Sequence, residues 1–133
     1  MLPTTEASVP KILIVDDQKS NVRLLEHMLK RAGYVDVVST TEPRAVAALH
    51  QQHHFDLMLL DLQMPELSGF EVMAQLQEVR RANPVAILVL SADATQLPAV
   101  FEAGADSFLG KPFRLPEVVE RVQLMLKPRP ASA

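Results

Sequence analysis

The sequence has 133 residues, which is enough for one domain with a single hydrophobic core and too few for two. Hydrophobic residues make up 48% of it, yet no apolar run approaches the roughly 20 residues of a membrane-spanning helix, and there are no cysteines for disulfides, thiolate catalysis or cysteine-ligated zinc. The net charge of −3, with one Tyr and no Trp, argues against direct nucleic-acid binding, which normally requires a concentrated basic surface.

The two ends of the sequence are predicted to be tails. Residues 1–10 and 128–133 are rich in Pro, Ser, Thr and Ala, so we expect a disordered N-terminal tail and, at the C-terminus, a free end or the start of a linker. Residues 11–127 then form the domain. The first ten residues lack a basic region followed by an apolar stretch, so no secretory signal is expected. With no cysteines, this predicts a cytoplasmic protein without membrane association.

Strand-like and helix-like patterns alternate through the first half of the domain. Lys11–Val15 predicts a strand, and Gln18–Ala32 predicts a helix that ends at Gly33. Val35–Ser39 predicts a second strand, which is less apolar and therefore nearer an edge of the sheet. Pro43–Gln52 predicts a helix with proline at its start. Its inward-facing residues are expected to be Ala45, Val46, Ala48 and Leu49.

The second half continues the alternation with further strands and helices. The strands are predicted at Phe55–Leu60, Val85–Leu90 and Asp106–Leu109. The helices are predicted at Ser68–Ala82, Thr95–Ala103 and Leu115–Leu126. The first two of these strands are apolar without alternation, which is typical of parallel strands covered by helices on both faces. Strand–helix units with short connections imply right-handed crossovers, a parallel sheet and an α/β fold.

Charged and polar residues stand where the predicted strands end. Asp16 and Asp17 end the first strand, Asp61 the third and Ser91 the fourth, and Lys111 follows the fifth. The carboxyl ends of parallel strands share one edge of the sheet, so these side chains are expected to meet. Three carboxylates repel one another, and a Mg²⁺ ion would relieve that repulsion. Lys111 would add a fixed charge, Ser91 a hydroxyl donor and Asp61 an oxygen nucleophile, the parts for phosphoryl transfer to a carboxylate.

Each of these residues also has a purely structural interpretation. Asp16 and Asp17 could cap the first predicted helix, and Asp61 could cap the third. Ser91 could start a turn, and Lys111 could be a solvated surface charge. The chain lacks the G-x-G-x-x-G turn of a dinucleotide fold after its first strand, and it lacks a P-loop. The coincidence of polar residues at four strand ends favours a functional site.

The chain from about Lys11 to Lys127 resembles the receiver domain of two-component response regulators, of the kind found in chemotaxis regulators. The resemblance rests on the motifs ILIVDD, LLDLQMPELSGFEV, VLSA and GADSFLGKPF, which occur in this order at the ends of the predicted elements. It implies a flavodoxin-like, doubly wound, five-stranded parallel sheet with strand order 2-1-3-4-5 and five helices.

The resemblance also implies an acceptor and a metal centre. Asp61 would be phosphorylated by the phosphohistidine of a histidine kinase or a phosphotransfer protein. Asp16 and Asp17 would form the acidic pair that holds Mg²⁺, directly or through water, beside Asp61. The backbone carbonyl of Gln63 would be a further ligand of the metal.

The resemblance also implies roles for residues around the acceptor, among them two residues that would move when the domain switches. Ser91 would bond the phosphoryl group and Lys111 would pair with it, and the Lys111–Pro112 peptide bond would be cis. Inward movement of Ser91 would let the aromatic residue of the fifth strand follow, and this residue is Phe108 where many relatives have Tyr. Ordinary core packing is the alternative interpretation of Phe108.

The resemblance further implies that Gln63 and Asp93 stand at variable positions that would tune the lifetime of the phosphoryl group. Asp93 is also expected to cap the helix before Thr95. By contrast, His50, His53 and His54 are expected at a solvated helix end. Arg80 and Arg81 are expected to be surface charges near the C-terminus of a helix.

The sequence therefore predicts a phosphorylation-controlled switch, not an enzyme, that engages an unknown target protein or output domain through its face from strand 4 to helix 5. The alternatives are an interaction-only domain that is never phosphorylated and, less favoured, a hydrolase with an aspartyl-phosphate intermediate. The hydrolase is disfavoured because Gln63 stands where such enzymes carry an acid two residues after the nucleophile. Glu117 and Arg121 resemble charged dimer positions of one subfamily, but Ser107 replaces its second Asp, so we expect a monomer, with a phosphorylation-dependent dimer as the alternative.

Overall fold

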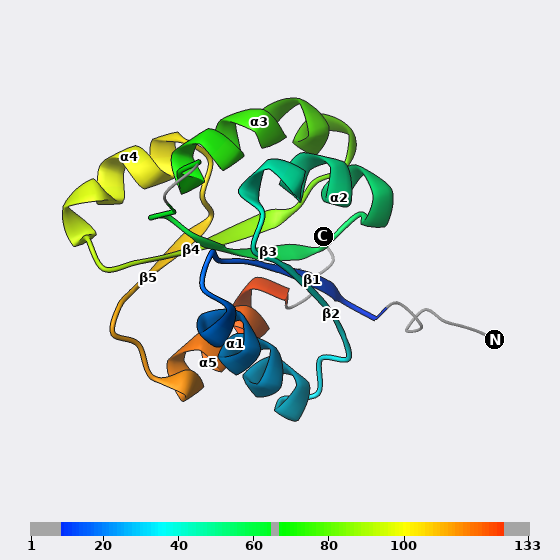
Figure 1. Ribbon diagram of the computed structural model, residues 1–133, viewed down its shortest axis with the longest axis vertical. Coiled ribbons are helices and arrows are strands. Elements are labelled where there is room, and N and C mark those ends of the chain that lie inside the picture. Colours follow the sequence, from blue (N-terminus) through cyan, green and yellow to red (C-terminus); the bar gives the residue numbers. More distant parts are fainter. Residues whose placement is uncertain (1–8, 65–66, 127–133) are drawn as a thin grey trace, which may run out of the picture.

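The computed structural model describes residues 9–64 and 67–126. One parallel sheet has the strand order β2-β1-β3-β4-β5, and helices lie on both of its faces (Figure 1). This confirms the flavodoxin-like α/β fold. The tails predicted at the two ends lie, apart from Val9 and Pro10, outside the described residues. No helix within the described ranges has the length and apolar character needed to cross a bilayer.

All the predicted strands and helices are present, with small shifts at their ends. The strands are β1 (Lys11–Val15), β2 (Asp36–Thr40), β3 (Leu57–Asp61), β4 (Ala86–Ser91) and β5 (Ser107–Gly110). The α-helices are α1 (Lys19–Arg31), α2 (Val46–His53), α3 (Gly69–Ala82), α4 (Leu97–Glu102) and α5 (Leu115–Leu126). The predicted second and fourth helices each begin with a 3-10 turn, η2 (Pro43–Ala45) and η3 (Ala94–Gln96).

The apolar strands β1, β3 and β4 form the buried centre of the sheet. Alternate residues along each strand face opposite sides, so Leu13 and Val15 pack toward α2, α3 and α4, whereas Ile12 and Ile14 pack toward α1 and α5. Figure 1 shows the same two layers of helices. The less apolar strand β2 lies at an edge of the sheet, as its composition predicted.

A capping box starts α3 directly after the loop that follows β3. The Ser68 hydroxyl accepts a hydrogen bond from the Glu71 backbone N–H at 3.3 Å, and the Glu71 carboxylate accepts one from the Ser68 N–H at 2.9 Å. At Gly69 an added Cβ would lie 2.9 Å from Leu62 Cα and 3.0 Å from the Asp61 carbonyl oxygen, so only glycine lets the helix begin this close to the strand. The cap of α3 is therefore Ser68, and Asp61 is left for another role.

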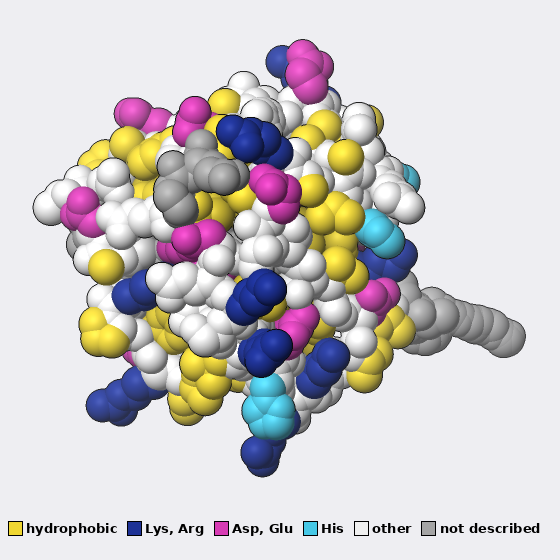
Figure 2. All heavy atoms as spheres, in the orientation of Figure 1, with side chains coloured by type: hydrophobic (Ala, Val, Ile, Leu, Met, Phe, Trp, Pro, Cys, Tyr) yellow, Lys and Arg dark blue, Asp and Glu magenta, His cyan; other side chains and the backbone are white. Residues whose placement is uncertain are grey.

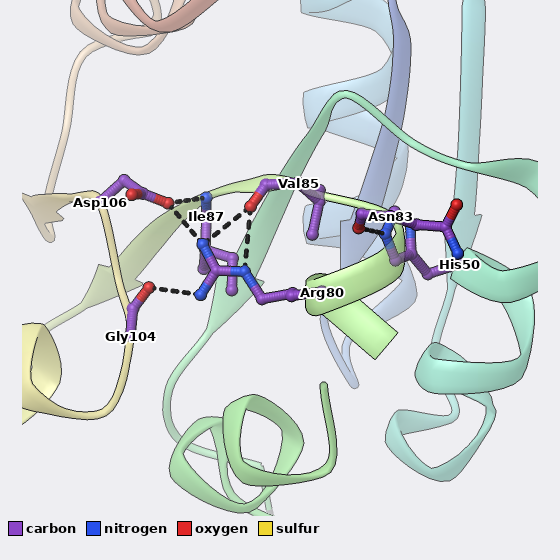
Figure 3. A network of polar contacts seen from close by, with 7 residues as sticks. All are labelled: His50, Arg80, Asn83, Val85, Ile87, Gly104 and Asp106. Carbon is purple, nitrogen blue, oxygen red and sulfur yellow. Dashed lines mark hydrogen bonds and ion pairs between the residues drawn. The ribbon is translucent and has the colours of Figure 1, made fainter. Parts of the chain in front are cut away.

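His50 corrects the expectation of a solvated histidine cluster. Its ring is fully buried, and Nε2 lies 2.6 Å from the Asn83 carbonyl oxygen (Figure 3). Nδ1 accepts a hydrogen bond from the Phe55 N–H at 3.1 Å. This pairing requires a neutral ring with its proton on Nε2. His50 occupies the inward position on α2, whereas Ala48, which was expected to face inward, is exposed. The ring joins α2 to the turn between α3 and β4.

Arg80 corrects a second expectation, because it is not a free surface charge. Its Nε and Nη2 both donate to the Val85 carbonyl, at 3.2 and 2.8 Å, and its Nη1 donates to the Gly104 carbonyl at 2.8 Å. Nη2 also lies 3.0 Å from the carboxylate of Asp106, which accepts the Ile87 N–H at 2.8 Å (Figure 3). The guanidinium thus ties the end of α3 to the start of β4 and to the turn before β5.

We expect His50→Ala to lower the free energy of unfolding by about 2–4 kcal/mol, because it leaves the buried Phe55 N–H and the partly buried Asn83 carbonyl without this partner and opens a cavity. Urea denaturation measures the change. Gln51→Ala, on an exposed position of the same helix, is the matched control and should stay within about 0.5 kcal/mol. Equal stability of the two variants would contradict the structural role of His50.

Candidate functional site

The carboxyl edge of the sheet gathers the polar residues that end the strands. Asp61 is the last residue of β3, beside Leu90 of β4, and Ser91 is the last residue of β4. Asp16 follows β1, and Lys111 follows β5 with its N–H donating to the Ser91 carbonyl at 2.8 Å. Short parallel strands in register place all these side chains within one small area.

Three carboxylates form a compact acidic cluster at this edge. Asp16, Asp17 and Asp61 each offer an oxygen that lies within 4.8 Å of the others. Asp16 and Asp61 are buried, with 2% and 6% of their surface exposed, and Asp17 is half-buried. An oxygen-only set with this separation could hold a hard divalent cation. The three carboxylate oxygens therefore have the chemistry and the spacing of ligands for such a metal ion.

The environment of Asp61 disfavours its negative charge. Burial raises the pKa of Asp61 above its ordinary value of 3.8, and the neighbouring charge of Asp16 raises it further. Lys111, whose Nζ lies 3.3 Å from Oδ1 of Asp61, and the backbone N–H of Gln63 act in the opposite direction without cancelling the effect. The single positive charge of Lys111 therefore does not neutralise the three carboxylates of the acidic cluster.

No side-chain hydrogen bond caps α1, whose N-cap residue is Gln18, so Asp16 is not the helix cap, but it contacts this start of the helix. Its Oδ1 accepts the Gln18 N–H at 2.9 Å, and its Oδ2 accepts the side-chain amide of Asn21 at 3.4 Å. Each carboxylate oxygen has two lone pairs, so both retain capacity for another partner. The structural role and a role in binding a cation are therefore compatible. Sequence reasoning missed Asn21, whose only signal is its position in the first turn of α1.

Ser91 is buried, and its hydroxyl oxygen accepts the Asp93 N–H at 3.1 Å, so it does start a turn. Its own O–H proton remains available for an acceptor near Asp61. Asp93 in turn accepts hydrogen bonds from the backbone N–H of Thr95, at 3.0 Å, and from the Thr95 hydroxyl. Asp93 therefore holds the start of η3, in agreement with its predicted capping role.

Other residues named from the sequence surround this centre. Phe108 is half-buried and pairs in register with Val89, packing against the core on the α2, α3 and α4 side. The Gln63 side chain is exposed at the rim. The Lys111–Pro112 peptide bond is cis in the structure.

Two hollows lie near the carboxyl edge of the sheet. One, of about 440 Å³, is lined by Asp16, Asn21 and Lys111 together with apolar residues of α1. The other, of similar volume, lies between the β3–α3 loop and η3 and is lined by Gln63 and Gln96 among others. Asp61 itself lines neither hollow, but its neighbours Asp16 and Lys111 line the first. Sequence reasoning did not identify Gln96.

The raised pKa of Asp61 has a consequence for stability. A carboxyl with a raised folded-state pKa stabilises the fold fully below its unfolded pKa and loses that contribution as the pH rises through the folded pKa. In the presence of a chelator, we therefore expect Asp61→Asn to be more stable than the wild type at pH 7.5, with the difference shrinking as the pH falls toward 4.5.

Thermal denaturation across this pH range measures the difference between the two proteins. Asp36→Asn, on the edge strand β2, is the control and is expected to follow the wild-type profile. A wild type at least as stable as Asp61→Asn at pH 7.5 would show that Lys111 compensates the buried charge.

The comparisons with known proteins agree with this arrangement. The family model for the response regulator receiver domain matches residues 12–123. The chain is 35% identical over 117 residues to the alkaline phosphatase synthesis transcriptional regulatory protein PhoP of Bacillus subtilis, with 88% of this chain and 48% of PhoP covered. The chain spans about half the length of the curated relatives it matches.

Solved structures show the same fold. The chemotaxis protein CheY4 of Vibrio cholerae superimposes with a TM-score of 0.80 at 29% identity, covering 90% of this chain and 100% of CheY4. The receiver domain of the sensor histidine kinase PA1611 from Pseudomonas aeruginosa, which has a magnesium ion in its active site cleft, gives 0.78 at 26% identity and covers 89% of this chain and 98% of that domain. Because the family match spans nearly all of the described residues and the strand order agrees, the chain belongs to the receiver domain family of two-component response regulators.

Proposed function

We propose that this receiver domain is a phosphorylation-controlled switch in which Asp61 accepts a phosphoryl group from the phosphohistidine of a histidine kinase or phosphotransfer protein. The observation that carries the proposal is the buried Asp61 carboxylate with Lys111 Nζ at 3.3 Å and two further carboxylates within 4.8 Å. A structural ion pair would not need the additional acidic residues. A phosphoryl acceptor does, because they bind the cation that neutralises the incoming group.

In the transfer, an Asp61 oxygen attacks phosphorus while the bond between phosphorus and the donor imidazole nitrogen breaks. The products are an acyl phosphate on Asp61 and a neutral imidazole, after a proton reaches the departing nitrogen. Lys111 balances negative charge on the phosphoryl oxygens, and the Ser91 hydroxyl donates to one of them. The chain supplies position and charge, so we regard it as a phosphoacceptor and not as an enzyme with a separate substrate.

Asp16, Asp17 and Asp61 are the side chains that would hold Mg²⁺, with the backbone carbonyl of Gln63 as a further ligand. The bound ion supplies positive charge to the phosphoryl oxygens and relieves the repulsion among the carboxylates. The proposal of magnesium is supported by the oxygen-only donors and by the related PA1611 receiver domain, whose structure has this ion in its cleft.

Phosphorylation would reach the rest of the protein through Ser91 and Phe108. An acceptor oxygen on Asp61 draws the Ser91 hydroxyl inward, and the half-buried ring of Phe108 can occupy the space that Ser91 leaves. Gln63 and Asp93, at the rim, would influence how readily water reaches the acyl phosphate. The surface from β4 to α5 would then engage a target.

The target would be an output domain or a separate protein, because the curated relatives are transcriptional regulators about twice as long as this chain. Nucleic acid would be bound by such an output domain and not by the receiver. Before phosphorylation we propose a monomer. Arg121 already donates within the chain to the Ser107 hydroxyl at 2.7 Å and to the Phe108 carbonyl at 2.8 Å, so it is not available to a second copy.

Intact mass spectrometry tests the acceptor. After incubation with acetyl phosphate and Mg²⁺, or with a phosphorylated histidine donor, the wild type and Asp36→Asn should each gain one labile phosphoryl group. Asp61→Asn, and the wild type with a chelator, should gain none. If neither donor modifies the wild type, the proposal is wrong and the interaction-only alternative holds, whereas repeated turnover of a phosphomonoester would favour the hydrolase.

Magnesium titration tests the acidic cluster separately. Asp17→Asn should weaken Mg²⁺ binding at least about tenfold, because it removes a charged oxygen ligand while leaving the buried Asp16 and Asp61 in place. Calorimetry measures the affinity, and Asp36→Asn should match the wild type. Unchanged affinity in Asp17→Asn would exclude this residue from the metal site.

A further inference from the structure

The first turn of α1 brings the side-chain amide of Asn21 to the acidic cluster. Its Nδ2 donates to Asp16 Oδ2 at 3.4 Å and to the Gln18 side-chain oxygen at 3.4 Å. An amide nitrogen carries two N–H groups, so both are used. Asn21 is half-buried and, with Asp16 and Lys111, lines a hollow of about 440 Å³. Neither the phosphoryl transfer nor the proposed set of metal ligands gives this residue a role.

Both oxygens of the Asp16 carboxylate are held by the chain that follows it. Oδ1 accepts the Gln18 N–H at 2.9 Å, and Oδ2 accepts the Asn21 amide. A bond to one oxygen alone lets the carboxylate turn about its Cβ–Cγ bond, whereas a second bond to the other oxygen fixes the plane of the group. Within the part of the chain that the structure describes, Asn21 is the one side chain that donates to Asp16. Its amide therefore sets the orientation of this carboxylate.

The partners of the Asp16 carboxylate are neutral. A backbone N–H and an amide orient it without pairing its charge, in contrast to Lys111, which forms an ion pair with Asp61. No Lys or Arg forms an ion pair with Asp16 within the described ranges. Cations are not scarce nearby, because Lys19 and Arg23 are exposed on α1, and Figure 2 shows Lys and Arg side chains gathered where Figure 1 draws this helix. A neutral amide in this turn therefore leaves the charge of Asp16 available to a metal ion.

The orientation of a carboxylate matters because cations differ in how strictly they constrain their ligands. Mg²⁺ demands near-ideal octahedral geometry with oxygens at about 2.0–2.1 Å, whereas Ca²⁺ accepts oxygens at about 2.3–2.6 Å in flexible arrangements. Residues that hold a metal ligand in place typically contribute about ten- to hundredfold to affinity. Both hydrogen bonds of Asn21 are long, so we expect an effect below that range.

We propose that Asn21 is a positioning residue of the metal site, and that by fixing the plane of the Asp16 carboxylate it makes the acidic cluster prefer Mg²⁺ to Ca²⁺. The inference rests on the proposed binding of a cation by Asp16, Asp17 and Asp61, and it adds the residue that sets the selectivity. Asn21 faces Asp16 with N–H groups, which cannot ligate a cation, so it acts through that carboxylate.

A purely structural role for Asn21 is the alternative. Its bond to Gln18 braces the start of α1, where the N-cap residue Gln18 makes no side-chain capping bond. Loss of such a brace would loosen the whole turn between β1 and α1, so it would weaken the binding of all divalent cations alike. A change in the ratio of Mg²⁺ to Ca²⁺ affinity therefore separates the two roles.

Calorimetric titration of the full, unphosphorylated chain with Mg²⁺ and, separately, with Ca²⁺ tests the proposal. Asn21→Ala should weaken Mg²⁺ binding at least about fivefold and Ca²⁺ binding less than about twofold, because the stricter ion loses more when the carboxylate is free to turn. Ser20→Ala, at an exposed position of the same turn, should match the wild type for both ions. Thermal denaturation in a chelator checks that each variant is folded.

A second variant tests the neutrality of this position. Asn21→Lys brings an ammonium group to the side of Asp16 on which the amide lies, where it competes with any bound cation. It should weaken Mg²⁺ and Ca²⁺ binding together, by at least about tenfold each. The loss of selectivity in Asn21→Ala and the loss of both affinities in Asn21→Lys are thus different signatures of one contact.

Labelling with acetyl phosphate keeps this inference apart from the proposed phosphorylation. At saturating Mg²⁺, Asn21→Ala should take up a phosphoryl group at a rate within about twofold of the wild type, because the bound ion then orients Asp16 itself. At limiting Mg²⁺ the variant should be slower. Normal labelling of the wild type together with unchanged selectivity in Asn21→Ala would overturn the positioning role and leave the acceptor standing.

Other results would also overturn the positioning role. Equal losses of Mg²⁺ and Ca²⁺ affinity in Asn21→Ala would mean that the residue only braces the helix. Wild-type affinity for Mg²⁺ in Asn21→Lys would show that this side chain does not face a metal ligand. A wild type that binds no Mg²⁺ would overturn both the proposed metal site and this inference.

Discussion

The structure depends most on a negative charge held at the end of an apolar strand. Strand β3 is buried along its whole length, and its last residue, Asp61, is a carboxylate with 6% of its surface exposed. The hydrophobic packing of the sheet fixes this position, while burial and Asp16 make the charge unfavourable there. The packing of the core thus holds an unfavourable arrangement of charges in place.

The two edges of the sheet differ in how well their polar groups are satisfied. At the amino edge, His50 joins two backbone groups, and Arg80 donates to two carbonyls and pairs with Asp106. At the carboxyl edge, three carboxylates share one lysine. The first edge therefore resists change and the second is suited to binding. A sheet that is rigid at one edge can hold a responsive site at the other without losing its fold.

The sequence contained enough information for the fold and for the place of the site, because both follow from local patterns. Apolar strands alternating with amphipathic segments predict a parallel sheet, and the rule that its strands end at a common edge brings Asp16, Asp61 and Ser91 together. The predictions for His50 and Arg80 were wrong because a polar residue near a helix end shows no sign of burial in sequence. Some of their partners also lie 33 and 24–26 residues away. Only the packing of α2 and α3 against the turns reveals them.

The two ends of α4 are attached to the rest of the molecule in different ways. The C-terminal end of α4 leads into Gly104, whose carbonyl accepts a hydrogen bond from Arg80. The N-terminal end is linked to Ser91, because the Asp93 N–H donates to the Ser91 hydroxyl and the Thr95 N–H donates to the Asp93 carboxylate. The C-terminal end of α4 is therefore held by Arg80, and its N-terminal end is connected to Ser91 through η3. A displacement of the Ser91 hydroxyl would therefore be felt first at the start of η3 and α4, while the end of α4 at Gly104 stays attached to Arg80.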